Sequence, residues 1–217
     1  MTKLTTRTGD DFKIYLTGPE DADRAVMLIH DWWGMKEYNR QWADRFAELG
    51  YRVMVVDLYD GYHPSDVQEA GQFMKDIDQE EANNKMAAAL NHLKAKGRKV
   101  AVLGWSFGGL QAQYATYLDP AAIAATVIYY CRLLTDMEDI ETLEGPVLAI
   151  FAESERTWPA KQEKLEALMQ EAGKVLECKS YPADHGFVNP ESSRYNAEAS
   201  EDSWQVTIDF LNRHLGG

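Results

Sequence analysis

The sequence predicts an α/β fold with a mostly parallel central sheet and helices on both faces. Short apolar runs alternate along the chain with segments in which apolar residues recur about every 3.6 positions. The middle runs are continuous and rich in Val and Ile, which is typical of strands covered on both faces. Right-handed crossovers between such strands place helices on both sides of the sheet. No repeat, linker or low-complexity stretch interrupts residues 1–217, so we expect one domain.

The expected strands share an apolar composition, and they cover residues 12–16, 25–29, 52–56, 100–103, 125–130, 146–151 and 175–181. The expected helices each show an apolar stripe at helical spacing. Three of the stripes end near a glycine that favours a helix C-terminus, namely Gly50, Gly97 and Gly173. The four stripes are Trp42, Phe46 and Leu49; Ala82, Met86, Ala89, Leu90 and Leu93; Leu165, Leu168, Met169 and Ala172; and Trp204, Ile208, Leu211 and Leu215. Residues 60–78 are polar and irregular, which indicates a lid or loop above the sheet edge.

The charge balance excludes several classes of partner. The chain has 22 basic and 35 acidic residues and a net charge of −13, so its surface repels nucleic acid and anionic membranes. No secretory signal and no apolar span of about 20 residues is visible, so we expect a cytoplasmic protein. Cys131 and Cys178 match no metal motif and are expected to be buried free thiols; no metal site is predicted.

A glycine-rich turn directly follows the apolar run 100–103. It reads Gly104-Trp105-Ser106-Phe107-Gly108-Gly109 and precedes a helical stretch. In this context the glycines permit a sharp strand-to-helix turn that exposes the serine hydroxyl. The amide of Phe107 would then lie at a helix N-terminus, where it can donate to an oxyanion. The turn predicts Ser106 as a nucleophile, and the alternative is a glycine turn selected only for close helix–sheet packing.

A serine nucleophile needs a base, and one of the five histidines is suitably placed. In folds with this turn, the acid and then the histidine follow the serine along the chain. His185 lies in a loop between the last strand and the last helix, so we predict it as the base; a surface-loop histidine is the alternative. The other four either precede Ser106 or lie on the last helix: His30, His63, His92 and His214.

The acid is expected in the loop after strand 146–151, which contains Glu153 and Glu155. Glu155 lies deeper in the loop and can point across the strand ends, so we favour it as the residue that orients His185. Glu153 would instead hold the loop or face solvent. Asp184 adjoins His185, but neighbouring residues in an extended loop point apart, so we interpret it as structural.

The loop His30-Asp31-Trp32-Trp33-Gly34 follows the second expected strand. A second oxyanion donor comes from such a loop in enzymes with this turn. Two adjacent tryptophans are not easily both buried, so we expect one to line a pocket. The alternative is that the two side chains only cover the sheet as part of the core. Tyr62 and Trp158 are further candidates for shaping this pocket.

Taken together in chain order, the loop 30–34, the turn 104–109 and the loop that contains Glu155 resemble the dienelactone hydrolase family, which has the α/β-hydrolase fold. The resemblance extends over nearly the whole chain. Residues 56–59, 185–190 and 194–199 add to the likeness. The resemblance implies a hydrolase that opens lactones or cleaves small esters, a small-molecule substrate, and no metal or organic cofactor. It implies a triad and an oxyanion hole made of backbone amides, with Asp31 and Trp33 on the substrate side. The implied triad is Ser106, Glu155 and His185, and the implied amides are those of Phe107 and Trp32.

Three positions differ from the family pattern. Ser106 stands where the archetypal members have cysteine, Glu155 where aspartate is usual, and Asp31 where glutamate is common. Because serine depends on histidine as a base, the differences favour a serine esterase on this scaffold. The arginines that bind a substrate carboxylate in the family have no clear match; Arg132 and Arg194 are the candidates, and a surface or structural role is the favoured alternative for each.

Two other functions remain open. The same triad could transfer the acyl group elsewhere, as a thioesterase or acyltransferase does. A non-catalytic small-molecule-binding protein would follow if the longer side chain of Glu155 misplaced His185.

Overall fold

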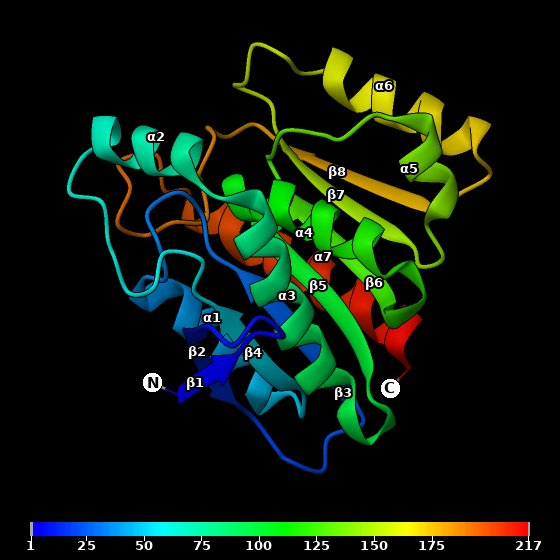
Figure 1. Cartoon of the computed structure of the whole chain (residues 1–217). Helices are drawn as coiled ribbons and strands as arrows, with labels where there is room; N and C mark the ends of the chain where they lie inside the picture. The colour runs from blue at the N-terminus through cyan, green and yellow to red at the C-terminus, as the bar shows by residue number, and fades with distance from the viewer. Residues whose placement is uncertain (1, 217) are drawn as a thin grey trace.

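The computed structural model describes residues 2–216, and its strands form one sheet (Figure 1). Within these residues the sheet has eight strands in the order β1-β2-β4-β3-β5-β6-β7-β8. The pairs β1–β2 and β2–β4 are antiparallel, and every other pair is parallel. The bounds are β1 Thr2–Thr5, β2 Asp11–Thr17, β3 Arg24–Ile29, β4 Arg52–Val56, β5 Lys99–Trp105, β6 Ile123–Tyr129, β7 Val147–Ala152 and β8 Leu176–Tyr181.

The seven strands expected from the sequence are confirmed, with ends that differ by at most two residues. The additional strand β1 was not predicted. It is an edge strand whose residues are mostly exposed, so it lacks the apolar pattern that identifies a strand in sequence.

The helices cover both faces of the sheet, which confirms the predicted fold class. In Figure 1, α3 and α4 lie in front of the sheet, while α1 and α7 lie behind it. The bounds are α1 Glu37–Glu48, α2 Val67–Asp76, α3 Gln79–Lys94, α4 Phe107–Leu118, α5 Met137–Thr142, α6 Ala160–Glu171 and α7 Ala197–Leu215. Short 3₁₀ turns occupy Ala95–Gly97 and Pro120–Ala122.

Alternating side chains of each central strand feed two separate cores. In β3, Val26 and Leu28 pack with the aromatic side chains of α1 and α7. Ala25, Met27 and Ile29 point to the other face, where they pack with α3, α4, α5 and α6. Burial on both faces is the reason that these strands have no polar alternation.

The C-terminus of α1 follows the expected glycine signal. Gly50 has φ 86°, its amide donates to Ala47 O at 3.0 Å, and the amide of Tyr51 donates to Phe46 O at 3.2 Å. This is a Schellman motif, which satisfies the last carbonyls of the helix. The prediction for Leu49 was wrong, because its side chain is 46% exposed and lies outside the core.

Residues 60–78 are more ordered than the sequence indicated. They contain α2, which begins after Asp66, whose carboxylate accepts the amide of Glu69 at 2.9 Å. Phe73 and Met74 rest against the core that includes Leu58 and Tyr59. The apolar positions are few and the surrounding residues polar, which hid the helical period in sequence.

The two cysteines differ in exposure. Cys131 is buried, as expected, but Cys178 in the edge strand β8 is half-buried, so that part of the prediction was wrong. No helix within residues 2–216 is long and apolar enough to cross a membrane.

Candidate active site

Ser106 lies in a sharp turn between β5 and α4. Its backbone has φ 53° and ψ −114°, a conformation that residues other than glycine rarely adopt outside functional sites. The amide of Ser106 donates to the carbonyl of Tyr129 at the end of β6, at 2.9 Å. The turn also requires glycine on both sides, since a Cβ at Gly104 would lie 2.0 Å from Gly108 O, and one at Gly108 would lie 2.2 Å from Ile29 O.

The structure brings together the three side chains that the sequence selected. The hydroxyl Oγ of Ser106 lies 2.7 Å from Nε2 of His185. On the other side of the imidazole, Nδ1 lies 2.5 Å from Oε1 of Glu155. With the proton on Nδ1, the ring donates to the glutamate and accepts from the serine, which is the tautomer a general base requires. Tyr130 packs beside this ring, with centroids 5.0 Å apart.

Glu155, and not Glu153, reaches the histidine. Glu153 instead accepts a hydrogen bond from the hydroxyl of Ser180 at 2.8 Å, and Asp184 is exposed. Burial by itself raises the pKa of the Glu155 carboxyl, but hydrogen bonds and charge from His185 and Lys161 outweigh this and lower the pKa below its ordinary value. The carboxylate is therefore ionised at neutral pH.

The two backbone amides expected in the oxyanion hole are available as donors. The amide of Phe107 begins α4, and first-turn amides have no acceptor within their own helix. The amide of Trp32 has no hydrogen-bond acceptor among residues 2–216. Both amides stay candidates for an oxyanion hole.

Asp31 fixes the loop that carries Trp32. Its Oδ1 accepts the amide of Trp33 at 2.9 Å, and its Oδ2 accepts the hydroxyl of Tyr38 at 2.5 Å. The side chain is 6% exposed, and this burial raises the pKa of the Asp31 carboxyl despite the two donors. The same burial and the nearby carboxylate raise the pKa of Tyr38 well above its ordinary value, so the phenol remains a donor.

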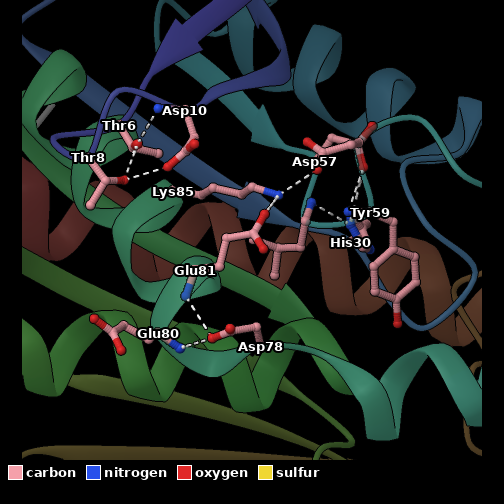
Figure 2. A network of polar contacts seen from close by, with 12 residues as sticks. Thr6, Thr8, Asp10, His30, Asp57, Tyr59, Asp78, Glu80, Glu81 and Lys85 are labelled. Atoms are coloured by element: carbon pink, nitrogen blue, oxygen red, sulfur yellow. Dashed lines mark hydrogen bonds and ion pairs between the residues drawn. The ribbon is translucent and has the colours of Figure 1, made fainter.

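His30 has a structural environment, in agreement with its exclusion as a base. Nδ1 donates to the carbonyl of Asp31 at 2.6 Å, and Nε2 accepts the amide of Leu58 at 3.0 Å. Burial lowers the pKa of the His30 imidazole, which favours the neutral form. Figure 2 shows His30 beside Asp57 and Tyr59, so the imidazole ties the loop after β3 to the loop after β4.

A pocket of about 460 Å³ opens beside Ser106 and His185. Both tryptophans, Trp32 and Trp33, line it, although only one was expected there. Tyr62 and Trp158 are not among its lining residues: Tyr62 stacks on Phe73, and Trp158 donates to Gln162. Asp31 lines the pocket as predicted.

Sequence reasoning missed several pocket residues. Lys36 precedes α1, Ser65 lies just before α2 and Val67 begins it, so a rim of the pocket belongs to the segment that looked irregular in sequence. Asn189 also lines the pocket, and its side chain accepts the amide of Glu191 at 2.9 Å. No local motif distinguishes Lys36, Ser65 and Val67 from ordinary surface positions, whereas Asn189 lies in the family-like segment 185–190. Of the two arginine candidates, Arg194 lines the pocket, whereas Arg132 is exposed outside it.

Within residues 2–216, no three or more His, Cys, Asp or Glu side chains gather in a way that could hold a metal ion.

Comparisons with known proteins agree with this architecture. The carboxymethylenebutenolidase homologue of Rattus norvegicus is 26% identical, over 95% of this chain and 89% of that protein. The protein usf of Aquifex pyrophilus is 25% identical, over 96% of each chain. A crystal structure of a dienelactone hydrolase-like promiscuous phosphotriesterase from metagenomic libraries superposes with a TM-score of 0.84 at 19% identity, over 99% of this chain and 98% of that one.

The structural neighbour shares the α/β-hydrolase fold. The model of the dienelactone hydrolase family matches residues 12–215, nearly the whole chain, and supports a hydrolase of the ester or lactone type. The chain therefore belongs to the dienelactone hydrolase family.

Proposed function

We propose that the protein hydrolyses small carboxylic esters or lactones with Ser106 as nucleophile, His185 as base and Glu155 as the acid that orients it. The observation that best supports this proposal is the continuous chain of contacts from Ser106 Oγ through His185 to Glu155, at 2.7 Å and 2.5 Å. Family membership supports the reaction class. The pocket beside Ser106 is of a size suited to a small-molecule substrate.

In the first half of the reaction, Ser106 Oγ attacks the substrate carbonyl while His185 Nε2 takes the hydroxyl proton. The amides of Phe107 and Trp32 donate to the oxygen that becomes negative, and each such donor is worth about 100- to 1000-fold in rate. Collapse of the tetrahedral intermediate breaks the ester bond, and His185 returns the proton to the leaving alkoxide.

In the second half, water replaces the alcohol in the site. His185 takes a proton from this water, and the resulting hydroxide attacks the acyl carbon. Collapse of the second intermediate releases the carboxylic acid and returns the proton to Ser106 Oγ. The negative charge of Glu155 stabilises the imidazolium in both halves.

The non-catalytic alternative rests on a misplaced His185, and the observed contacts count against it. The longer acid meets Nδ1 at hydrogen-bond distance while Nε2 still faces Ser106. A binding protein would have no need to keep Ser106 in a backbone conformation that costs about 1–3 kcal/mol.

The test is the Ser106→Ala variant, assayed with short p-nitrophenyl esters and with small lactones. We expect kcat/KM to fall by at least about four orders of magnitude, since the nucleophile is lost. Ser154→Ala is the matched control, because Ser154 is exposed on the loop of Glu155, and it should retain full activity. A fluorophosphonate probe should label folded wild-type protein at Ser106. Undiminished activity in Ser106→Ala, or no labelling of the wild type, would contradict the proposal.

The acyl acceptor is tested separately. Product analysis with added alcohols and thiols should give the free acid as the main product. A dominant alcohol ester or thioester product would instead identify an acyltransferase on the same residues. Preferential cleavage of thioester substrates over the matching oxygen esters would indicate a thioesterase.

A further inference from the structure

Glu155 has a second charged neighbour besides His185. Its Oε1 faces the imidazole, while its Oε2 forms an ion pair with the ammonium of Lys161. The side chains of Lys161 and Glu155 are 15% and 14% exposed, so the pair is largely removed from water. The same ammonium donates to the carbonyl of Cys131 at 3.1 Å.

The position of Lys161 is not explained by the stability of its helix. Lys161 lies in the first turn of α6, where the helix dipole disfavours a cation. Burying a lysine also costs desolvation and the rotamer freedom of a long side chain. The contacts of its ammonium are with Glu155, with the carbonyl of Cys131 after β6 and with the ring of Phe151 in β7, so the lysine is oriented towards the acid rather than towards its own helix.

The contacts of Lys161 link Glu155 to the segment after β6, and the end of β6 also contacts Ser106. Cys131 follows β6, and the carbonyl of Tyr129 at the end of β6 accepts the amide of Ser106. Glutamate has one more rotatable bond than aspartate, so a single hydrogen bond to His185 leaves it more freedom than an aspartate would have. With Oε2 held by Lys161, both carboxylate oxygens are fixed, and the longer acid can present Oε1 to His185 in one geometry.

We propose that Lys161 is the positioning residue of this site: it holds Oε2 of Glu155 so that Oε1 faces His185. This inference rests on the proposed hydrolase function. Lys161 does not contact the pocket and acts through Glu155.

Other titratable groups surround the pair. Tyr130 and Cys131 approach from the end of β6, and burial raises the pKa of the Cys131 thiol to about 12, so it stays neutral. Asp31 approaches His185 from the loop after β3. Substitution of Lys161 leaves Tyr130 and Asp31 in place; it removes the hydrogen bond to the carbonyl of Cys131, whose thiol stays neutral.

The test compares Lys161→Met, Lys161→Arg and the control Lys164→Met. Lys164 is exposed on the same helix and bonds Thr135 instead of the acid. In Lys161→Met we expect kcat to fall about 10- to 100-fold with little change in KM, because orientation is lost and substrate contacts are kept. Lys161→Arg should recover most of the loss, and Lys164→Met should match the wild type.

The pH profile separates positioning from a purely structural role. Removing a cation near the imidazole favours its protonated form, so the neutral base is reached only at higher pH. The acidic limb of kcat/KM should therefore move upwards by about half a pH unit or more in Lys161→Met. It should stay near the wild-type position in Lys161→Arg, which keeps the charge.

An NMR titration of the His185 ring in the resting protein gives the same comparison without any turnover. Its midpoint should rise in Lys161→Met, and this result stands whether or not Ser106→Ala abolishes activity. If Ser106→Ala keeps its activity while the His185 midpoint still shifts in Lys161→Met, only the hydrolase function is contradicted. An unshifted midpoint and an unchanged acidic limb in a folded Lys161→Met would overturn the role of Lys161. If Lys161→Met does not fold, Lys161→Gln takes its place, with the same expected result.

Discussion

At the scale of single residues, the two cations of the pocket have different surroundings. The ammonium of Lys36 lies 3.9 Å from the carboxylate of Glu191, which partly neutralises it. Arg194 lines the same pocket and has no ion-pair partner among residues 2–216. In a strongly acidic protein, a guanidinium without an ion-pair partner in the pocket of Ser106 can attract an anionic group of a substrate.

We therefore expect Arg194→Ala to raise KM for an ester that carries a carboxylate by about tenfold or more, since a hydrogen bond to a charged group contributes about 1.5–3 kcal/mol. For an uncharged ester of similar size, KM should change less than about twofold. Steady-state kinetics with both substrates measure the effect, and the exposed Arg132→Ala serves as control. Equal changes for the two esters would rule out a charge-specific contact.

The sequence could select Ser106 and His185 because their signals are local and ordered. A glycine-flanked serine between a buried strand and a helix is a specific pattern, and one histidine lies between the last strand and the last helix. Glu155 could be favoured over Glu153 only by its place in the loop. Lys161 could not be found, because a lysine early in a helix looks like any surface cation until the fold brings Glu155 against it. The catalytic roles of the first three residues stay predictions.

At the scale of elements, a buried lysine on α3 forms an ion pair with the segment that precedes α2. Lys85 is 3% exposed and forms ion pairs of 2.7 Å with Asp60 and with Glu81. Figure 2 shows the pair with Glu81. Burial lowers the pKa of Lys85, but the two carboxylates outweigh this effect and raise it above the ordinary value. Asp60 opens the segment that leads to α2 and to the pocket rim, so this ion pair holds the rim over the sheet.

Lys85→Met is expected to lower the free energy of unfolding by about 1–3 kcal/mol. Breaking a fully buried pair costs about 3–5 kcal/mol, but Asp60 and Glu81 are half-exposed and regain water when the lysine is removed. Urea denaturation measures the loss. Lys94→Met on the same helix removes a more exposed pair with Asp119 and should cost less than about 1 kcal/mol. A loss no larger than that of the control would mean that the segment is held by other contacts.

The elements also show where sequence patterns fail. Buried strands and amphipathic helices were predictable because their apolar residues are dense. Strand β1 and helix α2 were missed because their few apolar residues lie among polar ones, and tertiary contacts supply what the local pattern lacks.

At the scale of the whole molecule, charge is the dominant feature. The net charge of −13 is spread over a chain of 217 residues, so the excess negative charges of the folded protein repel one another at neutral pH. Sodium chloride screens this repulsion, because the Debye length falls from about 30 Å at 0.01 M salt to about 8 Å at 0.15 M.

Adding sodium chloride at pH 7.5 from about 0.01 M to 0.15 M should therefore raise Tm. A gain of about 1 kcal/mol corresponds to roughly 2–4 °C in a domain of this size. Differential scanning calorimetry measures the change, and near the sequence pI of about 4.8 the same salt should have little effect. A fall in Tm at neutral pH would show that attractive ion pairs outweigh the net repulsion.

The strand order of the sheet could not be read from the sequence. The placement of β4 between β2 and β3 depends on long-range pairing, for which a single sequence has no local signal. The one-domain organisation likewise remains a prediction.

The groups of the candidate site follow four different strands. Asp31 comes after β3, Ser106 after β5, Glu155 after β7 and His185 after β8. The buried strands supply the stability, and the loops at their ends supply the chemistry. Substitutions in one loop can therefore accumulate without loosening the sheet, so a lineage can exchange substrates while it keeps its scaffold. A solved structure at 19% identity still superposes with a TM-score of 0.84, so the same fold persists at low sequence identity.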